Sequence, residues 1–73
     1  MTEVLINKEQ IHLLAEQYGL SQNQVAYRIG VSRGSLSNAL NGRRGVGRKT
    51  LVGLLRLFPD QTVESLTMER RVA

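Results

Sequence analysis

Residues 20–38 read LSQNQVAYRIGVSRGSLSN, and their pattern predicts two short helices joined by a tight turn. Ser21 is followed three residues later by Gln24, a spacing typical of a capping box, so the first helix is expected over residues 22–29. Gly30 tolerates the positive φ that a tight turn demands, which places the end of this helix just before it.

The second helix is expected over residues 33–40, with Ser32 as its N-cap and Asn41-Gly42 at its end. Apolar side chains recur along both helices at the spacing of one buried face. These side chains are Val25, Ala26 and Ile29 in the first helix, and Leu36, Ala39 and Leu40 in the second. Val31 adds an apolar side chain from the turn. The pattern is that of a helix-turn-helix, whose second helix enters a DNA major groove.

Three further helices are predicted around this pair, at residues 8–18, 48–58 and 61–66. Asn7 and Asp60 are the expected N-caps of the first and the last of them, and Gln10 would complete a capping box with Asn7. The side chains expected to face the core are Ile11, Leu14, Ala15, Tyr18, Leu51, Leu54, Leu55, Phe58, Val63 and Leu66. Gly53 within a helix costs up to ~1 kcal/mol in propensity, so close helix packing is expected there.

The ends of the chain, residues 1–6 and 67–73, are interpreted as tails. For the C-terminal tail we favour fraying or a helix extension; the alternative is that the tails are strands, paired with each other or across a dimer. The fold class is therefore all-α: residues 1–73 form a single domain, a compact four- to five-helix bundle, with short terminal strands as the variant.

Composition excludes several classes of protein. A chain of 73 residues without cysteine builds one small domain with neither disulfides nor thiolate metal sites. His12 is the only histidine and has no clustered ligands, so no metal and no cofactor is expected. No apolar run approaches the ~20 residues of a membrane span, and no secretion signal is visible. No nucleophile has a base that the sequence reveals, so we expect no enzyme.

The net charge of +4 comes from one part of the chain. Residues 17–59 contain no Asp or Glu, whereas the segments on either side of them are acidic in sum. The cations of this acid-free segment are Arg28, Arg33, Arg43, Arg44, Arg48, Lys49 and Arg56. Such a segment predicts an anion-binding face, although charge alone does not distinguish DNA from RNA or acidic lipid, and a solvated surface remains the alternative.

The run Leu20-Ser21-Gln22, the apolar-alanine pair Val25-Ala26 and the turn Gly30-Val31-Ser32 resemble the phage-repressor helix-turn-helix, the Cro/XRE family. The resemblance covers about residues 8–66. It departs in the loop, where Val46 and Gly47 stand in place of a common proline and a capping serine. It implies a phage-repressor type of bundle, found in bacteria, phages or mobile elements, that binds operator DNA as a small transcriptional regulator.

Helix geometry leaves one face of residues 33–40 free to meet DNA bases. The candidate base contacts on it are Arg33, Gly34, Ser37 and Asn38. Arg33 lies in the first turn, where its guanidinium can pair with guanine O6 and N7, and Gly34 would let the backbone approach closely. The alternative for Arg33 is a solvated residue at the start of a helix.

A second set of residues is expected to bind the DNA backbone. Its members are Gln22, Asn23, Ser32, Asn41, Arg43, Arg44, Arg48 and Lys49. For Gln22 the resemblance implies a phosphate contact that also braces the recognition helix. Cations in the first turn of the helix over 48–58 oppose its macrodipole, which is better explained if an external anion lies there.

The sequence therefore predicts a cytoplasmic, sequence-specific repressor that binds double-stranded DNA as a homodimer, without a small-molecule effector. The dimer contact is expected from Val4-Leu5-Ile6, from residues 61–66 and from Leu66, Met68 and Val72, all outside the basic segment. One alternative is a protein-binding module, such as an antitoxin or an inhibitor of a regulator, that uses the same fold. Another is a non-specific nucleic-acid binder.

Overall fold

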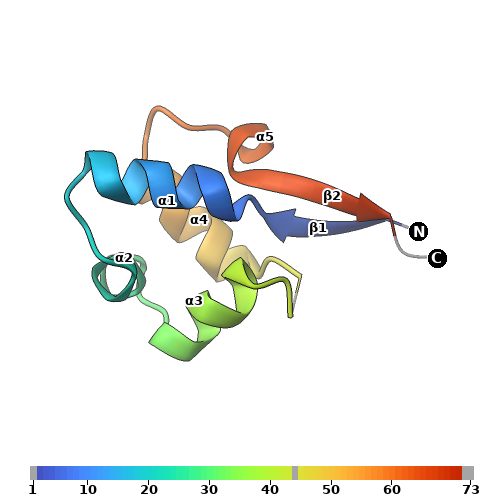
Figure 1. Ribbon diagram of the computed structural model, residues 1–73, viewed down its shortest axis with the longest axis horizontal. Helices are drawn as coiled ribbons and strands as arrows, with labels where there is room; N and C mark the ends of the chain where they lie inside the picture. The colour runs from blue at the N-terminus through green and yellow to red at the C-terminus, as the bar shows by residue number, and fades with distance from the viewer. Residues whose placement is uncertain (1, 44, 72–73) are drawn as a thin grey trace.

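The computed structural model describes residues 2–43 and 45–71 of the chain. Within them a helical bundle carries a two-stranded ribbon at one end, where both termini lie (Figure 1). In chain order the elements are β1 (Thr2–Ile6), α1 (Lys8–Gln17), α2 (Gln22–Ile29), α3 (Arg33–Leu40), α4 (Arg48–Leu57), α5 (Val63–Leu66) and β2 (Thr67–Arg71). The predicted bundle is thus confirmed, in the variant that has short terminal strands.

The bounds of α2 and α3 are those predicted, because local capping determines them. Ser21 Oγ accepts a hydrogen bond from the Gln24 backbone N–H at 3.1 Å, and the Gln24 side chain accepts one from the Ser21 N–H at 2.7 Å. Gly30 takes the left-handed conformation at φ 77° and ends α2. Ser32 Oγ accepts from the Ser35 N–H at 3.0 Å and begins α3.

The outer helices differ from expectation in their caps. Asn7 caps α1, but the Gln10 side chain donates to Gln61 Oε1 at 3.0 Å instead of closing a capping box. Asp60 is not the cap of α5. Thr62 is: its Oγ1 accepts from the Ser65 N–H at 3.2 Å while Ser65 Oγ accepts from the Thr62 N–H at 3.0 Å. Because of this reciprocal pair of hydrogen bonds, α5 begins at residue 63 and not at residue 61.

The tails form strands, which corrects the expectation of fraying or a helix extension. β1 and β2 pair antiparallel, with Glu3 opposite Arg70 and Leu5 opposite Met68. An Arg70 Nη2–Glu3 Oε2 ion pair of 2.7 Å joins the two strands. Leu5 is buried, which anchors β1 to the bundle. On the far side of β1, the Val46 N–H donates to the Val4 carbonyl at 3.2 Å, so β1 lies between β2 and the loop after α3.

The core gathers side chains from every helix and from β1. Its buried members include the predicted Ile11, Leu14, Val25, Ala26, Ile29, Leu36, Ala39, Leu40, Leu54, Phe58 and Leu66, together with Ile6. Three predicted core residues lie elsewhere: Leu51 is half-buried, whereas Tyr18 and Val63 are 46% and 44% exposed. Tyr18 still packs against Phe58 in a T-shaped arrangement, with ring centroids 5.0 Å apart. Thr50, which precedes Leu51 and was not expected in the core, is buried.

Candidate nucleic-acid interface

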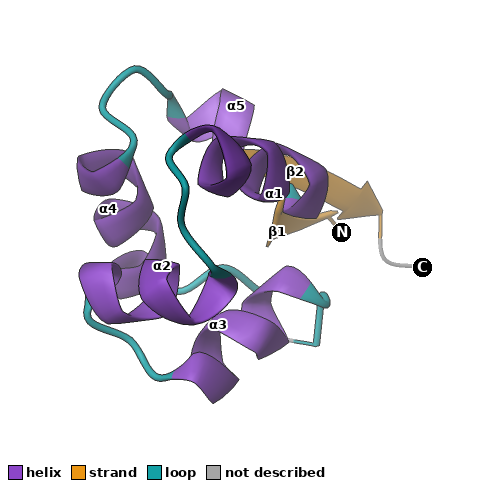
Figure 2. Cartoon of the chain, turned by 60° about the vertical axis from the view of Figure 1, so that its left-hand side comes forward, coloured by secondary structure: helices purple, strands orange, loops and turns teal. Residues whose placement is uncertain are grey.

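The turn between α2 and α3 holds the two helices at a fixed angle (Figure 2). The Val31 N–H donates to the Ala26 carbonyl at 3.1 Å, and the Gly30 N–H donates to that of Tyr27 at 3.2 Å. Val31 packs against the core, and Ala26 is fully buried, as a close contact between helices requires. These bonds and contacts orient α3 independently of any ligand, so its outer face is preformed.

The four candidate base contacts on α3 divide into two pairs. Arg33 and Gly34 are exposed, and the Arg33 side chain forms no hydrogen bond or ion pair with another described residue. Ser37 and Asn38 are half-buried and already bonded: Ser37 Oγ accepts from Asn41 Nδ2 at 3.2 Å. Asn38 Oδ1 accepts a long bond of 3.5 Å from Arg43 Nη1. The first turn of α3 is therefore its most accessible part.

Gly34 keeps the first turn of α3 open. A Cβ atom built on Gly34 would meet no heavy atom within 4 Å, so no contact within the protein explains why glycine stands there. Ser32, just before α3, has a structural task as well. Its hydroxyl caps the helix and donates to Ser35 Oγ at 2.9 Å, while the residue stays exposed.

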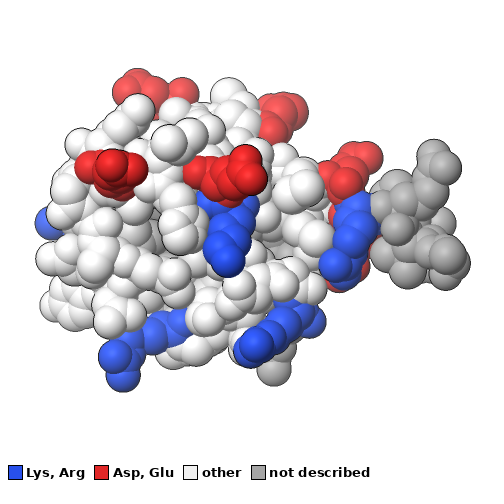
Figure 3. Space-filling view, viewed as in Figure 1, with Lys and Arg blue, Asp and Glu red and all other residues white. Residues whose placement is uncertain are grey.

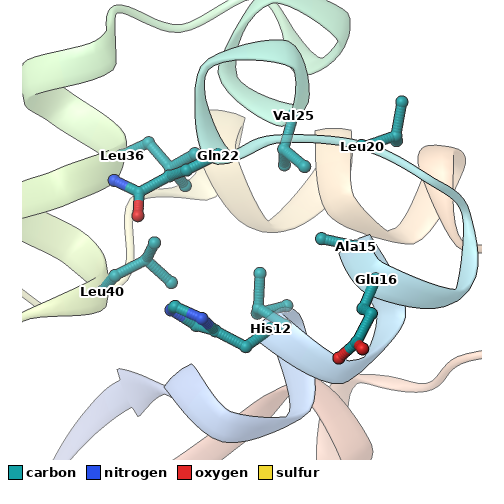
Figure 4. A pocket seen from close by; sticks show the side chains of 9 residues that line it. His12, Ala15, Glu16, Leu20, Gln22, Val25, Leu36 and Leu40 are labelled. Atoms are coloured by element: carbon teal, nitrogen blue, oxygen red, sulfur yellow. The ribbon is translucent and has the colours of Figure 1, made fainter.

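Gln22 and Asn23 lie exposed in the first turn of α2, which holds no acidic residue. Gln22 borders a hollow of about 350 Å³ between α1, α2 and α3. In Figure 4 the Gln22 side chain lies beside Leu36 of α3, with His12 on the opposite wall. No hydrogen bond joins the Gln22 amide to another described residue, so its polar atoms are free. Gln22 and Leu36 line the same hollow, and no hydrogen bond joins Gln22 to α3 among the described residues.

The loop after α3 and the start of α4 present exposed cations, namely Arg43, Arg48 and Lys49. Arg44, the fourth predicted cation of this group, lies outside the described residues. Gly47 is the N-cap of α4 and offers no side-chain cap bond, and the first turn of α4 contains no acid. Lys49 reaches the turn, since its Cε is 3.9 Å from a Cβ built on Gly30. The start of α4 therefore borders the helix-turn-helix.

Charge is unevenly distributed over the face shown in Figure 3. Lys and Arg atoms lie along the lower edge, over α3 and the loop after it, and acidic atoms lie on the upper part, over α1 and α5, while both kinds lie side by side in the centre and on the ribbon. Such a division gives the domain a basic side that attracts a polyanion and an acidic side that turns away from it.

One residue near α3 was missed by the reasoning from the sequence. Lys8, in the first turn of α1, donates from Nζ to Asn41 Oδ1 at 3.2 Å. In the sequence Lys8 lies among acidic residues, well before the basic segment, so its charge appeared to be offset locally. Only the fold brings it to the last turn of α3, across 33 residues of chain.

A family model described as a helix-turn-helix domain matches residues 9–59. The chain belongs to the helix-turn-helix domain family. The match runs from within α1 to just past α4 and includes the turn, all of α3 and the basic loop. It confirms the family inferred from residues 20–38.

The other comparisons add no relative to this helix-turn-helix domain. No curated protein matches the chain, and no solved structure matches it. The strands β1 and β2 lie outside the matched range. Among residues 2–43 and 45–71, no helix has the length and apolar character needed to cross a membrane.

Proposed function

We propose that this helix-turn-helix domain is a sequence-specific, double-stranded DNA-binding repressor, with α3 in the major groove. Membership of the family supports DNA as its partner. The observation that carries the proposal is the exposed first turn of α3. There the Arg33 side chain has no hydrogen bond or ion pair with a described residue, and a Cβ on Gly34 would meet no heavy atom within 4 Å. A guanidinium that is free at this place can read guanine, and each such pair discriminates by ~1–3 kcal/mol.

Phosphate binding by the surrounding residues would set the position of α3 on the duplex. Arg43, Arg48 and Lys49 are exposed beside α3 and the turn, and Gln22 and Asn23 offer free amides at the start of α2. Contacts of this kind supply affinity without sequence preference. Ser32, Ser37, Asn38 and Asn41 take part through groups that also hold α3 in place.

A homodimer is part of the proposal, because one recognition helix reads only a few base pairs. Two copies on half-sites ~34 Å apart would reach useful specificity. Leu5, Ile6 and Leu66 are unavailable for the contact, since they are buried within their own chain. Half-exposed apolar side chains remain on the ribbon and on α5, namely Val4, Val63 and Met68. Val72 lies outside the described residues.

Repression would be steric, through occupation of a site that overlaps a promoter. A regulator of this kind works where the genome lies, which in a bacterial or phage-infected cell is the cytoplasm.

The test is selection from a library of random DNA duplexes at about 0.15 M salt, followed by sequencing of the bound molecules. An enriched two-fold motif with half-sites near ten base pairs apart is expected. Binding without enrichment would make the protein a non-specific binder. Absence of binding would favour the protein-binding module, whose contacts would be indifferent to Arg33→Ala.

A further inference from the structure

Lys8 holds an unusual place at the junction of three elements. It is the first residue of α1, directly after β1 and Asn7, and its side chain extends to the far end of α3. A cation in the first turn of a helix opposes the macrodipole of that helix, whereas a cation at the last turn of a helix is favourable. The Lys8 side chain therefore places its charge at the C-terminal end of α3, where a cation is favourable, and not at the start of its own helix.

Asn41 orients the ammonium group within a short chain of hydrogen bonds. Its Oδ1 accepts from Lys8 Nζ at 3.2 Å, while its Nδ2 donates to Ser37 Oγ at 3.2 Å. Lys8 lies on the exposed surface, and the bond to Asn41 uses one of its three ammonium protons. Two donors of this group, and its full charge, remain available to an external anion.

A second cation approaches the same turn of α3. Arg43 Nη1 lies 3.5 Å from Asn38 Oδ1. Arg43 and Lys8 thus each contact a side-chain amide oxygen near the C-terminal end of α3. Neither Lys8 nor Arg43 forms an ion pair with a described carboxylate, although Glu9 follows Lys8 directly in the chain. Neutral amide partners position the two cations without neutralising them, which is the arrangement that a polyanion requires.

We infer that Lys8 is a further DNA-backbone contact, which binds a phosphate beside the one bound by Arg43. The inference rests on the proposed function. It extends the DNA-binding surface beyond the basic segment of the sequence, to the start of α1. Asn41 becomes a positioning residue, since it holds the ammonium group at the edge of α3 before DNA arrives.

The test is the salt dependence of DNA binding, because each phosphate neutralised by a cation adds about 0.9 to the slope of log K against log salt. Binding of the DNA enriched by selection, or of a mixed-sequence duplex if no motif is enriched, is followed by fluorescence anisotropy over about 0.05–0.3 M salt. Lys8→Met is expected to flatten the slope by about 0.9 and to weaken binding about three- to tenfold at low salt, for all sequences alike.

Three matched variants separate a phosphate contact from a structural effect. Lys8→Arg keeps the charge and is expected to keep the slope. Asn41→Ala removes the oriented hydrogen bond but leaves the ammonium group, so affinity should fall while the slope stays. Arg56→Met removes one exposed cation from the last turn of α4 and changes net charge equally, so it controls for charge alone.

The outcomes distinguish this inference from the proposed function. Lys8→Met with the wild-type slope, beside Arg43→Met with a flattened one, would restrict Lys8 to its hydrogen bond with Asn41 and would overturn the inference alone. Equal flattening by Lys8→Met and Arg56→Met would also overturn it, as a general effect of net charge. If the wild-type protein shows no salt-dependent DNA binding, the proposed function itself is wrong. Circular dichroism confirms that each variant is folded at the temperature of the titration.

Discussion

Gly53 of α4 packs directly on Ile29 of α2. A Cβ built on Gly53 would lie 2.6 Å from Ile29 Cβ and 3.1 Å from the Ile29 carbonyl oxygen. Both atoms belong to the backbone or to the root of a side chain, so neither can turn aside. This contact confirms the close packing expected from a glycine within a helix, and it seats the first helix of the helix-turn-helix on α4.

Gly53→Ala should therefore destabilise the protein, although alanine has the higher helix propensity. The added methyl group must displace α2 or α4, and overpacking of this kind costs about 1–3 kcal/mol. Urea denaturation measures the free energy of unfolding, and each kcal/mol corresponds to roughly 4–8 °C in Tm for a domain of this size. A Tm equal to that of the wild type would contradict the packing described here.

Gly34→Ala is the matched substitution in α3, and it should have the opposite effect on stability. Its Cβ would meet no heavy atom, so the gain in helix propensity, up to ~1 kcal/mol, is expected without strain. DNA binding should weaken, because the methyl group would stand on the face that is proposed to meet the bases. Thermal unfolding and anisotropy on the same sample check both parts. Unchanged DNA affinity would show that the backbone at Gly34 does not approach the groove closely.

Arg33→Ala and Arg43→Ala should change DNA binding in different ways. Loss of the free guanidinium of Arg33 should relax one position of the selected motif, at a cost of about 1–3 kcal/mol for the preferred base. Loss of Arg43 should weaken binding to all sequences and flatten the salt slope by about 0.9. Repeating the selection with each variant measures this difference. Preservation of the complete motif by Arg33→Ala would remove Arg33 from the base contacts.

Thr62→Ala should destabilise the protein by about 0.5–2 kcal/mol, because it removes the N-cap of α5. Asp60→Ala is the control: Asp60 is exposed and caps no helix, so its loss should change the free energy of unfolding by less than about 0.5 kcal/mol. Chemical denaturation of the two variants compares them directly. A larger effect at Asp60 would show that Asp60 is the N-cap, as the sequence predicted.

The helix-turn-helix could be predicted from the sequence because its determinants are local. The caps Ser21 and Ser32 and the left-handed Gly30 act within four residues of the backbone groups that they satisfy. The spacing of apolar residues in α2 and α3 also fixes which face is buried, and hence that Arg33 is exposed. The exposure of Arg33 and Gly34 was within reach of the sequence, whereas Ser37 and Asn38 on the same face are half-buried, and the use of these residues in binding DNA stays a prediction.

The buried side of α5 depends on contacts with distant parts of the chain, and the sequence predicted it only in part. Leu66 was expected to be buried and is, whereas Val63 in the same helix was expected to be buried and is exposed. Four residues are too few for periodicity to define a face, so the packing of neighbours decides which side is buried.

Capping, glycine conformation and charge depend on neighbouring residues, and for that reason the two helices of the motif, their turn and the basic segment follow from the order of the amino acids. The pairing of Glu3 with Arg70 and the contact of Lys8 with Asn41 arise only when the chain has folded. In each of these pairs the partners are far apart in the chain. A strand can pair with many other strands, and a long cationic side chain can bond to many other residues. The folded core selects one of them by bringing β1 to β2 and α1 to α3.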